Sequence, residues 1–110
     1  GMATYVLLLT LYPEGRERVA ADPEVLARAE VAAATPGVRC LGLYGVLGKY
    51  DFVAMAEAPD NEAIARFSLN FGVRAGAHIE TLPAVPVGLL SERELQPAAG
   101  SETSETEPVL

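Results

Sequence analysis

The side chains best suited to bind a ligand lie in two short segments of the sequence, around residues 44–51 and 78–80. A carboxylate that directly follows a turn is free to accept hydrogen bonds from a ligand, and histidine is the side chain that titrates near neutral pH. The predicted ligand-binding residues are Tyr44, Gly48, Tyr50, Asp51, His78 and Glu80.

Asp51 is the leading candidate, because it is predicted to point away from the helical side of a sheet. Two structural roles are open to it instead, since aspartate often accepts hydrogen bonds from backbone amides near a turn or pairs with a neighbour such as Lys49. Tyr44 and Met55 similarly either form the wall of a small apolar pocket or pack in a dimer interface.

His78 and Glu80 are two residues apart on a predicted strand, so both side chains point to one side. They could begin a metal site, take part in acid–base chemistry or make ordinary hydrogen bonds. Zinc sites usually have three or four protein ligands, and the sequence contains no CxxC, HxH or HExxH motif. We therefore expect no metal and no cofactor.

Common catalytic and nucleotide-binding motifs are absent: there is no serine-nucleophile motif, no Walker loop and no GxGxxG fingerprint. The sequence favours a small module that binds a polar metabolite at a dimer interface or between sheet and helices. One alternative is a cofactor-independent isomerase or monooxygenase-like enzyme with His78 or a carboxylate as base. Another is an assembly protein whose acidic tail or sheet edge contacts a partner.

The formal net charge of -7 over 110 residues predicts that nucleic acid is not a direct partner, because a phosphate backbone is repelled. No apolar run approaches the ~20 residues of a membrane-spanning helix, and no export signal is recognised. The lone Cys40 cannot form an intramolecular disulfide and is predicted to be a buried, reduced thiol beside Glu57. These features predict a cytoplasmic protein without membrane contact.

Hydrophobic periodicity and turn residues predict a βαββαβ order within residues 1–90, followed by an acidic tail over 91–110. The second helix should begin after Asp60 and end at Gly72, and Asp22-Pro23 should divide the first helical region into two pieces. The predicted strands and first helical region are 4–11, 14–35, 38–47, 50–57 and 77–82.

A two-residue turn at Gly48-Lys49 would pair Tyr44 with Val53 and Gly45 with Phe52. The strand 4–11 is apolar on both sides, and two helices can cover only one face of a four-stranded sheet. We therefore predict that a second copy covers the other face, giving a homodimer or larger homo-oligomer.

The run Gly48-Lys49-Tyr50-Asp51-Phe52-Val53, followed by Glu57-Ala58-Pro59-Asp60, resembles the GYD-domain family of small bacterial proteins. Gly15, Phe67 and Gly76 are in matching order. The resemblance covers about residues 3–87 and implies an α+β, ferredoxin-like fold whose sheets pair as a dimeric α/β barrel.

The same hairpin also resembles the effector-binding domain of Lrp/AsnC regulators, which implies a ligand site near a dimer interface. Only Met2-Ala3 precede the first strand after Gly1, so no helix-turn-helix is expected. The resemblance to the GYD family implies no assigned reaction.

Overall fold

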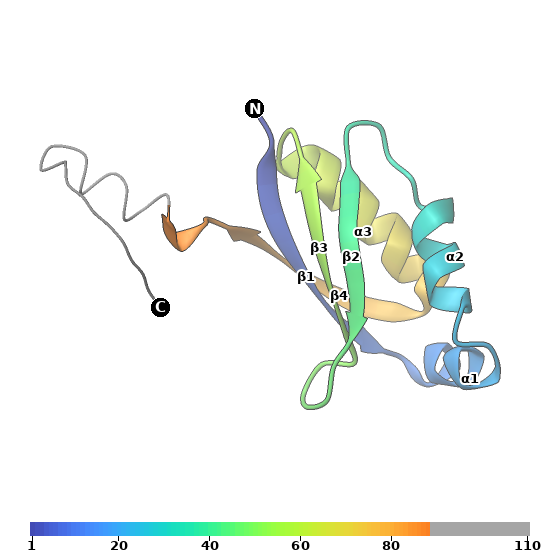
Figure 1. The fold of residues 1–110 in the computed structure, drawn as a ribbon. Helices are drawn as coiled ribbons and strands as arrows, with labels where there is room; N and C mark the ends of the chain where they lie inside the picture. Colours follow the sequence, from blue (N-terminus) through green and yellow to red (C-terminus); the bar gives the residue numbers. More distant parts are fainter. Residues whose placement is uncertain (89–110) are drawn as a thin grey trace, which may run out of the picture.

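The computed structural model describes residues 1–88, which form a four-stranded antiparallel sheet with helices on one face (Figure 1). The elements are β1 (Ala3–Leu11), α1 (Pro13–Ala21), α2 (Val25–Ala32), β2 (Arg39–Gly45), β3 (Phe52–Ala58), α3 (Asn61–Ala75) and β4 (Ala77–Ala84). The strand order β2-β3-β1-β4 is that of a ferredoxin-like fold. The predicted α+β fold class is confirmed, whereas the predicted tail 91–110 lies outside the described residues.

The core lies between the sheet and α3. Alternate residues of the two central strands, including Leu7, Leu9 and Ala54, are fully buried on this side. Phe67 and Phe71 of α3 pack together with ring centroids 5.5 Å apart and are at most 2% exposed. The small side chains on β3 leave space for these two rings, so helix-on-sheet packing fills the core with few aromatic residues.

Two aspartates lie at the helix boundaries that the sequence predicts. Asp22 lies between α1 and α2, and its Oδ1 accepts a hydrogen bond from the Glu24 N–H at 3.1 Å. Asp60 precedes α3, and its Oδ1 accepts one from the Ala63 N–H at 2.9 Å. These side chains satisfy N–H groups that have no partner within a helix.

The predicted end of α3 at Gly72 is wrong, because the helix continues to Ala75 and is capped by Gly76 in the left-handed conformation, with φ 70°. Gly72 has a packing role instead: a Cβ there would lie 2.9 Å from the Ala77 carbonyl oxygen. A glycine that permits close approach of a strand and a glycine that ends a helix look alike in sequence.

The register of β2 and β3 matches the predicted pairing of Tyr44 with Val53 and of Gly45 with Phe52. The predicted two-residue connection is wrong, because β2 ends at Gly45 and β3 begins at Phe52, which leaves residues 46–51 between the strands. A bulge between Cys40 and Gly42 then adds a residue to β2, so Cys40 pairs with Ala56. The predicted pairing of Cys40 with Glu57 is therefore wrong, because an extra residue reverses the alternation of faces.

Candidate functional site

The face of the sheet opposite the helices carries a continuous apolar surface. Strand pairing places Val6 between Met55 and Leu82, and places Val53 between Leu8 and Tyr44. Tyr44 is 60% exposed and Leu82 is 43% exposed, while the other side chains are half-buried. We call this surface the open-face patch; it consists of Val6, Leu8, Tyr44, Val53, Met55 and Leu82.

Of the six predicted ligand-binding residues, the structure brings Tyr50 and Glu80 together. The Tyr50 hydroxyl lies 3.4 Å from Glu80 Oε2, and His78 is on the same side of β4. Tyr44 is in the same row of paired residues as Glu80 but three strand spacings away, roughly 14 Å. Gly48, with φ 140°, lies in the exposed segment between β2 and β3.

Asp51 joins the end of the hairpin to β1. Its Oδ2 accepts a hydrogen bond from the Leu11 N–H at 2.8 Å, and its own N–H donates to the Leu9 carbonyl at 2.9 Å. Lys49 lies instead over the Tyr50 ring, 5.7 Å from its centroid. A structural role thus accounts for this carboxylate, and ligand contact by Asp51 stays a prediction.

Replacing Asp51 with alanine should lower the free energy of unfolding by about 1–3 kcal/mol, because the Leu11 N–H loses its acceptor in a part-buried position. Asp51→Asn keeps an acceptor oxygen and should cost less. Urea denaturation of both variants tests this difference. Equal stability of wild type and Asp51→Ala would show that the hydrogen bond contributes nothing measurable.

Cys40 packs against the core as a half-buried free thiol. Burial raises the pKa of this thiol, and the nearby Glu30 carboxylate raises it further. A raised pKa leaves less thiolate at neutral pH, and the thiolate is the nucleophile. The side chain has a packing role and is half-buried, not buried as predicted, and its carboxylate neighbour is Glu30 and not Glu57.

Within residues 1–88, no cluster of three or more histidine, cysteine, aspartate or glutamate side chains is arranged to hold a metal ion. In the same part of the chain, no helix is long and apolar enough to cross a membrane.

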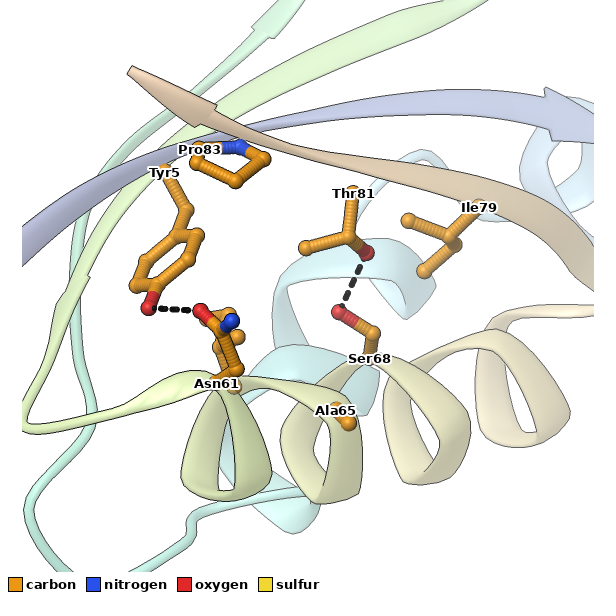
Figure 2. Close-up of a pocket in the computed structure, with 8 residues that line it drawn as sticks. Tyr5, Asn61, Ala65, Ser68, Ile79, Thr81 and Pro83 are labelled. Atoms are coloured by element: carbon orange, nitrogen blue, oxygen red, sulfur yellow. Dashed lines mark hydrogen bonds between the residues drawn. The ribbon is translucent and has the colours of Figure 1, made fainter. Parts of the chain in front are cut away.

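A cleft of ≈ 420 Å³ lies between α3 and the sheet, on the side opposite the open-face patch. Two side-chain hydrogen bonds span it (Figure 2): the Tyr5 hydroxyl donates to Asn61 Oδ1 at 2.6 Å, and the Ser68 and Thr81 hydroxyls are 2.8 Å apart. The lining residues are Tyr5, Asn61, Ile64, Ala65, Ser68, Ile79, Thr81 and Pro83. Its volume is within the roughly 300–1,000 Å³ usual for ligand sites.

A family model described as the GYD domain matches residues 5–92, which include nearly all of the described sheet and helices. The chain belongs to the GYD domain family. The resemblance carried by the Gly48-to-Asp51 hairpin is thereby confirmed.

This GYD domain protein is 37% identical over 93 residues to the glutamine synthetase and cystathionine beta-lyase binding protein of Thermus thermophilus. The match covers 84% of this chain and 98% of that protein. A solved structure with a similar fold is the leucine response regulatory protein of Mycobacterium tuberculosis, with a TM-score of 0.50 and 12% identity. That match covers 76% of this chain and 51% of the regulator, so the GYD domain protein spans about half of its length.

None of the six predicted ligand-binding residues lines the cleft of this GYD domain protein. One signal in the sequence was available: Ser68 is a polar residue within the apolar periodicity of α3, whose neighbours Ile64, Phe67 and Phe71 are buried. The partner hydroxyl of Thr81 lies on another element and comes close only through the β1–β4 register.

Proposed function

We propose that this GYD domain protein is a homodimeric interaction module that binds a metabolic enzyme. The observation that carries the proposal is the open-face patch, an apolar surface across all four strands that no helix of residues 1–88 covers (Figure 1). Contiguous apolar surfaces of this kind usually contact another protein.

A second copy is the proposed cover for this patch. A two-fold dimer brings identical surfaces together, and an apolar sheet face is complementary to itself. Pairing in this way leaves the helices of each copy free to contact other proteins.

The similarity to a protein named for binding glutamine synthetase and cystathionine beta-lyase supports an enzyme as the second type of partner. The two chains match over almost the full length of that relative. The net charge of -7 also favours a protein partner over a nucleic acid.

Size-exclusion chromatography with light scattering tests both parts of the proposal. The purified chain alone should have the mass of a dimer. Mixed at micromolar concentration with glutamine synthetase or cystathionine beta-lyase from its own source organism, it should co-elute with at least one enzyme. An unrelated acidic protein is the control, and a monomer that co-elutes with neither enzyme would contradict the proposal.

A second candidate function is binding of a small polar metabolite at the rim of the open-face patch. The contact between the Tyr50 hydroxyl and Glu80, with His78 nearby, favours this function because it groups hydrogen-bonding side chains on a surface that a second copy would enclose. Native mass spectrometry of the untreated protein tests it. A stoichiometric extra mass on the dimer supports metabolite binding, and bare dimers argue against it.

A further inference from the structure

The outer edge of β4 offers backbone groups to another strand. β4 pairs with β1 on one side, and no strand of residues 1–88 pairs with its other side. In an antiparallel pair, successive residues direct their N–H and C=O groups alternately toward and away from the partner strand. Pro83 is opposite Tyr5 of β1. Because proline has no N–H to donate to β1, it fits a position whose backbone groups are directed away from β1.

Thr81 and Ile79 lie two and four positions before Pro83, so their N–H and C=O groups share its outward direction. Their side chains point toward α3 and line the cleft described above (Figure 2). The outer edge of β4, which no strand of residues 1–88 pairs with, and the cleft are thus adjacent parts of one surface.

The chemistry of this surface selects an uncharged occupant. None of the eight lining side chains carries a charge at neutral pH, although the chain as a whole has a net charge of -7. Ile64, Ala65, Ile79 and Pro83 supply apolar walls. Hydroxyl groups take part in both hydrogen bonds that span the cleft, and the Asn61 amide takes part in one of them. A buried unpaired charge would be costly there, whereas a small apolar or hydroxyl side chain would be accepted.

We propose that an extended, uncharged segment of the partner enzyme binds as an additional strand along the outer edge of β4. Main-chain hydrogen bonds form with Ile79 and Thr81, and one side chain of the segment enters the cleft between α3 and the sheet. Strand addition of this kind combines backbone affinity with side-chain selection by a pocket. The inference rests on the proposed function and assigns the enzyme contact to a surface separate from the open-face patch.

Filling the cleft tests the side-chain part of the inference. Ala65 is exposed on α3 and lines the cleft, so Ala65→Phe should occupy it without entering the core. The dissociation constant for the enzyme that co-elutes with the wild-type protein should rise at least about tenfold, as measured by isothermal titration calorimetry. Ala27→Phe, at an exposed position on α2, is the matched control and should bind as wild type does.

Removing one edge donor tests the backbone part. Thr81→Pro deletes an outward N–H, and Thr81→Val keeps that N–H while losing the hydroxyl that contacts Ser68. The proline variant should bind about tenfold more weakly than the valine variant. Because the proline variant could fold poorly, hydrogen exchange on the wild-type chain provides a second measurement: the amides of Ile79 and Thr81 should exchange more slowly in the complex.

The outcomes separate this inference from the proposed function. If the wild-type protein forms no complex with either enzyme, the proposed function and the strand-addition inference are both overturned. A complex that Ala65→Phe leaves intact, or in which exchange slows on the open-face patch but not on β4, overturns only the strand-addition inference. Slow exchange at Ile79 and Thr81 in the chain alone would mean that a second copy occupies the edge, which also overturns it.

Discussion

Replacing Val6 with glutamate is expected to convert the proposed dimer into monomers. Val6 lies on the open face between Met55 of β3 and Leu82 of β4, neither of which can pair with a carboxylate. Burying an unpaired charge costs several kcal/mol, and a two-fold interface would bury one from each copy. The dimer dissociation constant should therefore rise by about 100-fold or more.

Sedimentation velocity over a concentration series measures this change directly. Val73→Glu is the matched control, because Val73 is 74% exposed on α3 and lies outside the open-face patch. The control should remain a dimer with wild-type affinity. If Val6→Glu dimerised as tightly as wild type, the open face could not be the interface. If both variants dissociated, the helical surface would contribute as well.

The fold could be predicted from the sequence because its signals are local. Strand patterns, the break at Asp22-Pro23 and the register of β2 with β3 each depend on neighbouring residues, and the structure agrees with them. Two of the errors concern closely packed backbone. The role of Gly72 is set by the Ala77 carbonyl of β4, and the bulge before Gly42 is visible only from the pairing with β3.

The candidate sites were harder to predict because they combine distant segments. The predicted residues Tyr50 and Glu80 are 30 positions apart in sequence, yet the Tyr50 hydroxyl contacts the Glu80 carboxylate. The Asp51 carboxylate bonds to the backbone of Leu11, 40 positions away, which no local pattern indicates. The cleft depends on neutral side chains such as Asn61, which do not stand out in a search for catalytic or metal-binding residues.

Changing Gly15 to alanine is expected to destabilise the fold, against the usual effect of this substitution in a helix. Gly15 is buried in the first turn of α1, and a Cβ there would lie 2.3 Å from the Gly76 carbonyl oxygen and 2.9 Å from that of Ala75. Both atoms belong to the backbone, and the Gly76 carbonyl also accepts the Tyr12 N–H at 2.8 Å. Relief of the clash would require α1 to move away from the end of α3.

The sign of the stability change decides between two effects. Helix propensity alone favours alanine over glycine by about 0.5–1 kcal/mol, whereas overpacking costs about 1–3 kcal/mol. We expect overpacking to dominate and the melting temperature to fall by roughly 4–8 °C for each kcal/mol lost. Gly45→Ala is the control, because its Cβ would meet only the Phe52 ring, at 3.5 Å. A Gly15→Ala variant more stable than wild type would show that α1 shifts freely, and that its contact with α3 does not constrain the fold.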